Sequence, residues 1–199
     1  MNNTLKMTFT AVLTALSVVA NAVSVQISGS NYLSFTYVPC FIAAIYLGVI
    51  PATAVGFVGD LIAGLLFPNG AYNILIGVSS TLIGTIPAVL YKFNPNRRLL
   101  NLVIALVACS VVCTAGLNTY ALWLMYGAAN GKTFWVYLGG RLPFQLLNTV
   151  VNGVIIGVLQ QTKALDRLFA RLQLTPNKTV EEESEQSPPD EGAENDNKE

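Results

Sequence analysis

Histidine is absent from this chain, and charged residues are scarce. None of the 199 residues is His, and Asp, Glu, Lys and Arg together make up only 11% of the sequence, against about 25% in an average soluble domain. Without His, the commonest general base and the usual zinc and haem ligands are missing. Hydrophobic residues make up 53% of the chain, so the composition favours a membrane protein over a soluble one.

Cysteine is rare as well, and its three residues lie in apolar segments. Cys109 and Cys113 are four positions apart and share a helix face, while Cys40 lies elsewhere. We expect buried, inert thiols. The sequence also lacks a phosphate-binding glycine loop and a catalytic triad. We therefore predict no ATP hydrolysis, no enzyme activity, no metal and no cofactor, and a membrane enzyme is the less favoured class.

The few charges are unevenly distributed. From Met7 to Tyr91 the only charged residue is Asp60, and from Leu99 to Thr162 only Lys132 and Arg141 are charged. Residues 1–173 contain nine Lys and Arg but two Asp, whereas 174–199 contain two Lys and nine Asp and Glu. We predict a basic membrane domain over 1–173 and an acidic, disordered tail over 174–199.

Six apolar segments approach the roughly 20 residues that a helix needs to cross a bilayer. They are Met7–Ile27, Tyr37–Ile50, Pro51–Phe67, Ala71–Tyr91, Leu99–Tyr126 and Phe134–Gln161. Residues 37–67 as one helix would extend about 46 Å, which exceeds a hydrocarbon core of roughly 30 Å. Leu47–Pro51 supplies Gly and Pro for the turn between the two halves. The sequence predicts an all-α integral membrane protein with six transmembrane helices.

The distribution of Lys and Arg predicts the orientation. With six spans both termini lie on one side, and that side collects seven basic residues against two on the other, which favours the cytoplasm for the termini. The cytoplasmic group is Lys6, Lys92, Arg97, Arg98, Lys163, Arg167 and Arg171. We expect a multi-pass protein of the cell membrane. A signal peptide cleaved near Ala20–Ala22 is the alternative, but the apolar run continues to Ile27.

Polar residues interrupt the last apolar segment at helical spacing. Arg141, Gln145, Asn148 and Asn152 recur at i, i+4, i+7 and i+11, so they form one stripe on a helix. A polar stripe in a bilayer must face protein or a cavity, and intramembrane charge is usually functional. With Lys132 and the helix N-terminus, Arg141 would attract anions at a pocket open to the outer face. Alternatively, Arg141 extends to lipid phosphates and the amides join helices.

Asp60 lies among small residues, because Ala52, Gly56 and Gly64 recur with it at intervals of four. This face allows close approach of another helix. Asp60 would then be buried, in an ion pair such as one with Arg141 or in a hydrogen bond. A structural role is favoured over ligand contact.

Other polar and aromatic residues are expected near the same pocket. Asn118 can donate and accept hydrogen bonds, as recognition of a heteroaromatic edge requires, but it could equally join helices. Asn73 starts a face of small and polar residues. Aromatic residues gather at the outer side and fit an interfacial belt; Tyr37 and Phe67 belong to this group, and one or two of its members could stack on a flat ligand.

Three parts of the sequence together resemble a known family. They are Ala11-x-x-x-Ala15, "SFTYVPCFIAAIYLGVIPATAVGFVGDLIAGLLFPNGAY" from Ser34 to Tyr72, and "LNTYALWLMYG" followed by Arg141. Over about Leu5 to Lys163 the chain is similar to the substrate-binding S component of an energy-coupling factor (ECF) transporter, most of all the folate-type subgroup. The acidic tail is outside the resemblance.

The resemblance implies a subunit that captures a vitamin from outside and delivers it through a shared transmembrane T component driven by two ATPases. It further implies that Ala11 and Ala15 form the docking face and that Arg141, Asn118 and the Phe67–Tyr72 loop line the pocket. Folate is the expected substrate, because its pterin offers hydrogen-bonding edges and its carboxylates suit Arg141; another small anionic vitamin would also fit. No nucleic-acid partner is expected.

The candidate substrate-binding residues are therefore Arg141, Asn118, Gln145, Asn148, Phe67, Asn69, Tyr72, Asn73, Tyr37, Lys132 and Asp60. Two alternatives keep the six helices. One is a membrane assembly or interaction protein whose polar residues only pack helices. The other is a self-contained secondary carrier, although the internal repeat typical of that class is not found in the sequence.

Overall fold

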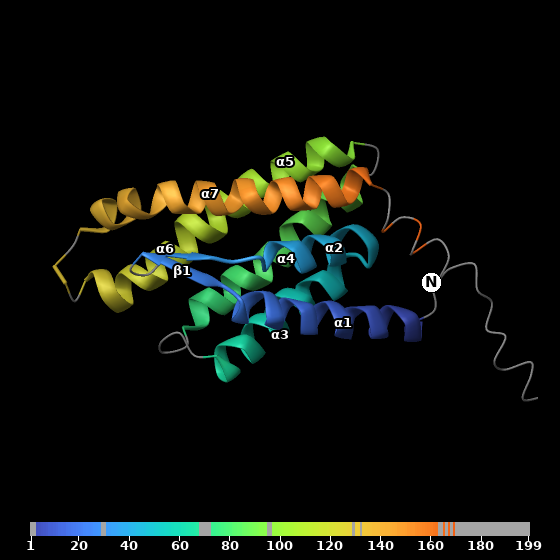
Figure 1. Ribbon diagram of the computed structural model, residues 1–199, viewed down its shortest axis with the longest axis horizontal. Helices are drawn as coiled ribbons and strands as arrows, with labels where there is room; N and C mark the ends of the chain where they lie inside the picture. The colour runs from blue at the N-terminus through green and yellow to red at the C-terminus, as the bar shows by residue number, and fades with distance from the viewer. Residues whose placement is uncertain are drawn as a thin grey trace, which may run out of the picture. The chain divides into compact units, whose positions relative to one another are not determined.

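The computed structural model describes residues 3–28, 31–67, 73–94, 97–128, 130–131 and 133–162, together with Leu165, Arg167 and Phe169. The elements are α1 (Asn3–Ala22), β1 (Val25–Ser28), β2 (Asn31–Leu33), α2 (Tyr37–Tyr46), α3 (Val49–Leu66), α4 (Ile74–Phe93), α5 (Arg98–Ala108), η1 (Cys109–Asn118), α6 (Thr119–Leu122), η2 (Trp123–Gly127) and α7 (Phe134–Gln161) (Figure 1). Residues 1–163 form one compact unit. The predicted boundary at residue 173 and the acidic tail lie outside the described residues.

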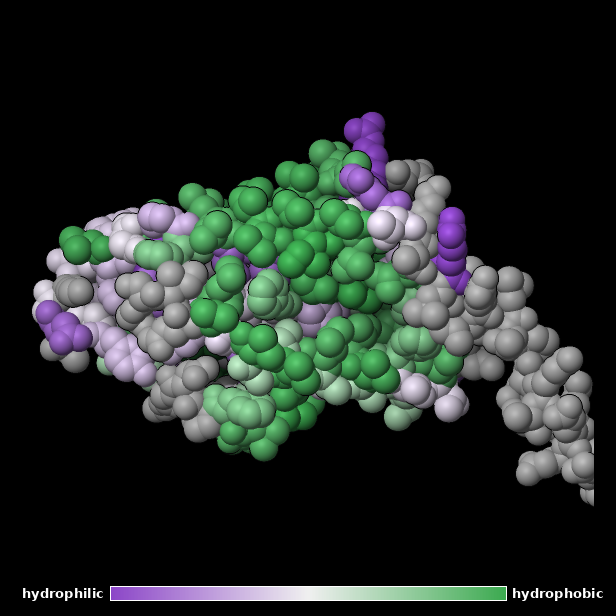
Figure 2. Space-filling view, viewed as in Figure 1, coloured by the Kyte–Doolittle hydropathy of each residue, from purple (hydrophilic) through white to green (hydrophobic). Residues whose placement is uncertain are grey.

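Five helical segments of the described residues are long and apolar enough to cross a membrane: α1, α3, α4, the continuous helix from α5 through η2, and α7. The sixth predicted segment forms α2, which is apolar but has only 10 residues and a length of about 15 Å. Figure 2 shows apolar side chains over the middle of the visible face and more polar ones at the end that carries the hairpin. The prediction of a helical protein with apolar, membrane-length helices is confirmed for these five segments, and the count of six crossings stays a prediction.

The predicted turn between α2 and α3 is confirmed. Gly48 lies between the helices with a φ of 94°, in the region that favours glycine. Pro51 follows in the first turn of α3, where a missing N–H breaks no helical bond. The chain reverses here, and most of α2 is buried by the neighbouring helices.

The prediction of a helical segment extending to Ile27 is wrong. Helix α1 ends at Ala22, and β1 pairs antiparallel with β2, with Val25 opposite Leu33 and a bulge between Gln26 and Ser28. From Val23 to Ser28 β-branched apolar residues alternate with polar ones, which is the pattern of a strand. A prediction from hydrophobicity alone therefore made the helix too long.

Small residues allow α3 and α4 to pack closely, as the sequence predicted. A Cβ added to Gly56 would overlap the backbone carbonyl oxygen of Ser80, and one added to Gly84 would overlap that of Ala52. Thr53 and Thr85 join the same two helices by a hydrogen bond of 2.9 Å between their hydroxyls. Close backbone contact with a polar cross-link is typical of helix pairs in membranes.

Replacing Gly84 with alanine is expected to destabilise the protein by about 1–3 kcal/mol, because the new methyl group has no space against a backbone carbonyl. Thermal unfolding in detergent measures the effect. Gly139→Ala is the matched control, since a Cβ at Gly139 meets nothing within 4 Å. Equal melting temperatures for the two variants would contradict the assigned close contact.

Candidate ligand-binding site

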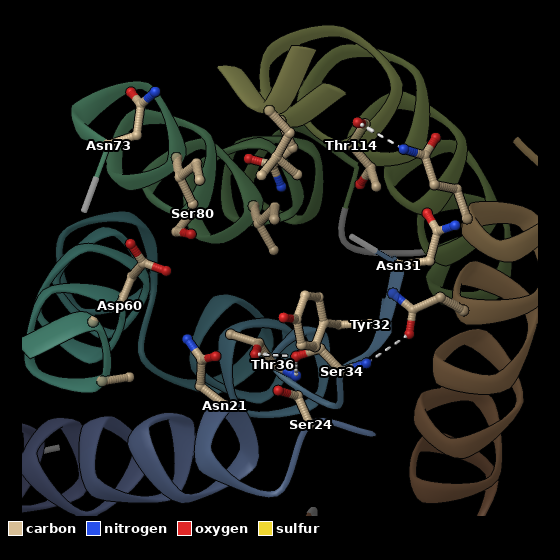
Figure 3. A pocket seen from close by; sticks show the side chains of 18 of the residues that line it. Asn21, Ser24, Asn31, Tyr32, Ser34, Thr36, Asp60, Asn73, Ser80 and Thr114 are labelled. Carbon is tan, nitrogen blue, oxygen red and sulfur yellow. Dashed lines mark hydrogen bonds between the residues drawn. The ribbon is translucent and has the colours of Figure 1, made fainter. Parts of the chain in front are cut away.

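A cavity of about 270 Å³ lies within residues 1–163, close to the roughly 300–1,000 Å³ of small-molecule sites. Its walls come from the segment around the hairpin, from the adjoining ends of α3 and α4, from η1 through η2, and from α7 (Figures 1 and 3). The polar lining residues are Asn21, Ser24, Asn31, Ser34, Thr36, Asp60, Asn73, Ser80, Thr114, Asn118, Arg141, Gln145 and Asn148, and the aromatic ones are Tyr32, Tyr37, Phe67, Tyr126 and Phe144.

The polar stripe of α7 faces the interior. The buried residues of this helix are Arg141, Gln145, Asn148, Asn152 and Ile156, so all four residues of the predicted stripe are buried. Arg141, Gln145 and Asn148 line the cavity, whereas Asn152 does not. The apolar faces of α7 carry exposed residues such as Leu146 and Val150, as a helix bordering lipid should.

Arg141 is enclosed by protein and is only 8% exposed, so its side chain does not extend to lipid phosphates. The guanidinium carbon lies 5.7 Å from the centre of the Tyr137 ring, one helical turn away, within range of a cation–π contact. Its Nε and Nη1 atoms are buried and have no hydrogen-bond partner among the described residues. Two donors of a cation are therefore available to a ligand in the cavity.

Three amide oxygens complement these donors. The Oδ1 atoms of Asn118 and Asn31 and the Oε1 atom of Gln145 are buried without a partner in the described part of the chain, and all three residues line the cavity. An unpaired buried acceptor costs free energy until a donor meets it. The site therefore suits a ligand that presents acceptors or negative charge to Arg141 and N–H donors to the amides.

The wall that carries Asn118 is a π-helix. In η1 each turn is wider than in an α-helix, and such segments concentrate at functional sites. Gln145 stabilises this geometry, because its Nε2 donates to the carbonyl oxygen of Thr114 at 3.1 Å and to the Thr119 hydroxyl at 2.8 Å. The Thr119 hydroxyl in turn donates to the Thr114 carbonyl at 2.9 Å. Gln145 thus joins α7 to η1 and still offers Oε1 to the cavity.

Tyr37 and Asp60 contribute from α2 and α3. The Tyr37 hydroxyl lies 2.5 Å from that of Thr114, and the residue is only 4% exposed, which fixes an aromatic ring against η1. Asp60 is 7% exposed and projects from α3 toward the interior in Figure 3. Both side chains line the cavity.

The structure brings eight of the eleven candidate residues to one cavity. They are Arg141, Asn118, Gln145, Asn148, Phe67, Asn73, Tyr37 and Asp60. Asn69, Tyr72 and Lys132 lie outside the described residues. Asn73 also caps α4, because its Oδ1 accepts a hydrogen bond of 2.9 Å from the backbone N–H of Leu75.

The cavity has a second group of lining residues that the sequence patterns did not predict: Asn21, Ser24, Asn31, Ser34, Thr36 and Phe144. All but Phe144 belong to the segment from the end of α1 to the start of α2. The signal that could have found them is a run of Ser, Asn and Thr around Tyr32, between two apolar segments. In a membrane protein such a polar run must meet water, protein or ligand.

The predicted docking residues lie away from this cavity. Ala11 and Ala15 are exposed on α1 and line a groove of about 790 Å³ between α1 and α3, together with Thr10, Thr14, Pro51 and Ala54 among others. The groove is largely apolar except for its threonines and Lys6. Its small side chains leave room for another helix.

The three cysteines are free and buried, as expected. Within the residues that the structure describes, no group of three or more Cys, Asp or Glu side chains is arranged to hold a metal ion.

An apolar exterior around a polar, part-aromatic cavity defines a membrane-embedded binding subunit. The family model for the substrate-specific component of ECF transporters matches residues 5–159, so the chain belongs to this family of integral membrane proteins, and the resemblance stated above is confirmed. A solved S component of a bacterial ECF transporter is 21% identical and has a TM-score of 0.63 over 82% of this chain and 97% of that chain. FolT bound with folic acid is 23% identical, with a TM-score of 0.64 over 82% and 95%. The comparison with curated proteins gives no match.

Proposed function

We propose that this protein binds folate, or a closely similar anionic vitamin, in the cavity and delivers it through an ECF transporter. The observation that carries the proposal is that one cavity contains two donor nitrogens of Arg141 and the side-chain oxygens of Asn118 and Gln145, all without a hydrogen-bond partner within the described part of the chain. Folate contains a flat pterin with N–H donors, together with carboxylates. The similarity in fold to FolT bound with folic acid supports this choice of ligand.

The aromatic lining adds to the argument. Tyr32, Tyr37 and Phe144 line the cavity beside the polar groups, and aromatic rings bind flat heteroaromatic ligands by stacking or edge contacts. The predicted roles of Phe67 and Asn73 as binding residues belong to the same proposal, since both line the cavity near the ends of α3 and α4.

We further propose six membrane crossings, with α2 as a short crossing surrounded by other helices, both termini in the cytoplasm and the cavity at the outer face. Figure 1 places the start of α1, the α2–α3 turn, the end of α4 and the start of α5 at one end of this unit, and the hairpin at the other. Lys92 lies at the end of α4, and Arg97 and Arg98 lie at the start of α5, so these basic residues gather opposite the cavity. The positive-inside rule then puts the cavity outside.

Energy for transport is proposed to come from partners, namely a T component and two ATPases, because the sequence contains no nucleotide-binding motif. The groove between α1 and α3, which Ala11 and Ala15 line, is the proposed contact surface for the T component. Its small residues allow close helix packing within the bilayer.

Native mass spectrometry of the protein extracted from membranes tests the ligand. We expect a bound species with the mass of a folate and, in titration calorimetry, tighter binding of folic acid than of riboflavin, thiamine or biotin. Tighter binding of another vitamin would overturn the folate assignment. A folded protein that binds none of the four, and carries no small molecule, would overturn the capture function and favour a role in helix packing alone.

A further inference from the structure

Ser34 connects the hairpin to α2. Strand β2 ends at Leu33, and Thr36 precedes the first residue of α2. The Ser34 hydroxyl lies 2.6 Å from the Thr36 hydroxyl and also accepts from the Thr36 backbone N–H at 3.3 Å. This single residue therefore sets the direction in which the chain leaves the hairpin and enters the helix.

Both backbone polar groups of Ser34 are bound by α7. The Ser34 N–H donates to Oδ1 of Asn148 at 3.1 Å, and Nδ2 of Asn152 donates to the Ser34 carbonyl oxygen at 2.8 Å. Figure 3 shows the first of these bonds running from Ser34 to the helix beside it. Two side-chain amides thus take the place of a neighbouring strand, one residue beyond the end of β2.

Asn152 also orients Asn148. Its Nδ2 donates to Oδ1 of Asn148 at 3.1 Å and to the Asn148 carbonyl oxygen at 2.9 Å. Because acceptors surround Nδ2 of Asn152 and two donors meet Oδ1 of Asn148, the orientation of both amides is determined by their neighbours. Asn152 is 0% exposed and is not among the residues that line the cavity.

The hairpin depends on this attachment. Strands of four and three residues are too short to form a stable unit by themselves, and α7 is the helix that β2 packs against. Yet this segment places Asn31, Tyr32, Ser34 and Thr36 at the cavity. The position of one cavity wall is therefore determined through Ser34.

We propose that Asn148 and Asn152 are positioning residues, forming an amide clamp on the Ser34 backbone that pre-organises the hairpin wall for ligand binding. The inference rests on the proposed function, because it assumes that the cavity binds a vitamin. It assigns Asn148 a different role from the direct ligand contact predicted from the sequence. Such a clamp raises affinity because it keeps the hairpin wall in its binding-competent conformation before the ligand arrives.

The test compares Asn152→Ala with Asn101→Ala in the full-length protein. Asn101 is as buried as Asn152, at 2% exposed, and donates to the Asn94 carbonyl oxygen outside the cavity lining. We expect Asn152→Ala to weaken folic acid binding about tenfold or more, although the residue does not line the cavity, and Asn101→Ala to leave it unchanged. In the ligand-free protein, Asn152→Ala should speed hydrogen exchange of residues 31–36, and saturating folic acid should restore protection.

Aspartate substitutions test the acceptor and donor roles of the two amides by hydrogen exchange in the ligand-free protein. Asn148→Asp keeps an oxygen that accepts from Ser34 and Asn152, so residues 31–36 should retain slow exchange. Asn152→Asp replaces the donor by an acceptor facing the Ser34 carbonyl, so residues 31–36 should exchange faster. The double variant Asn148→Ala with Asn152→Ala should bind about as weakly as the worse single variant, since both belong to one unit.

The exchange measurement needs no ligand, so it separates failure of the clamp from failure of the proposed function. Unchanged exchange of residues 31–36 in Asn152→Ala, or faster exchange with unaltered affinity, would overturn the clamp. If the parent protein binds no vitamin but Asn152→Ala still accelerates exchange, the proposed function is wrong and the positioning of the hairpin by α7 stands.

Discussion

Replacing Arg141 with alanine is expected to weaken folic acid binding by about 2 to 4 kcal/mol, roughly 30- to 1,000-fold. The guanidinium is only 8% exposed, and its Nε and Nη1 atoms have no partner among the described residues. In the parent protein a carboxylate or ring acceptor of the ligand accepts hydrogen bonds from these donors in a low-dielectric cavity. In the variant these hydrogen bonds are lost entirely. Titration calorimetry with folic acid measures the change in dissociation constant.

Two further variants define what Arg141 supplies. Arg141→Lys keeps the charge but lacks the planar fork of donors, so we expect an intermediate loss. Arg97→Ala removes a cation that is exposed and remote from the cavity lining, and should bind as the parent does. An Arg141→Ala variant that unfolds at the parent temperature and binds folic acid with parent affinity would refute the role given to this residue.

The stripe on α7 is the part of the site that sequence spacing predicts best. Arg141, Gln145, Asn148 and Asn152 are separated by helical intervals, and an apolar environment leaves a helix with such a stripe only one way to face. All four residues are buried in the structure. Spacing alone does not show which of these residues contact the ligand and which position other segments. The partners of Gln145, Asn148 and Asn152 come from segments far away in the chain.

The irregular elements are what the sequence does not predict. Residues 99–126 were expected to form one ordinary helix, and the helix is continuous, but η1 and η2 are π-helical. The carbonyl oxygen of Thr114 accepts hydrogen bonds from Gln145 Nε2 and from the Thr119 hydroxyl. A tertiary contact therefore compensates for the altered backbone bonding. The helix propensity of the residues around Thr114 cannot indicate this hydrogen-bond partner, which lies 31 positions away in the sequence.

Small residues were informative for a physical reason. Gly56 was expected on a close-packing face, and in the structure backbone atoms of the facing helix fill the space that a side chain at this position would need. The end of α2 was predictable as well, because the turn expected at Leu47–Pro51 contains Gly48, which has a positive φ in the structure.

Replacing Ala11 or Ala15 with tryptophan is expected to abolish uptake of the vitamin by cells while leaving its binding to the isolated protein unchanged. Both alanines are exposed on α1 and line the groove between α1 and α3. Neither of them lines the ligand cavity. A bulky ring in this groove would prevent a helix of the T component from approaching closely. Uptake of labelled folate and calorimetry of the purified variants provide the two measurements.

The matched control is Val12→Trp, which adds the same ring to α1 at an exposed position outside the groove lining. If groove filling is the cause, Val12→Trp transports like the parent, and co-purification of the T component is lost only with Ala11→Trp or Ala15→Trp. Equal loss of uptake in all three variants would point to impaired membrane insertion of α1. Loss of ligand binding alongside uptake in the alanine variants would show that the groove and the cavity are not independent, and the docking assignment would then be wrong.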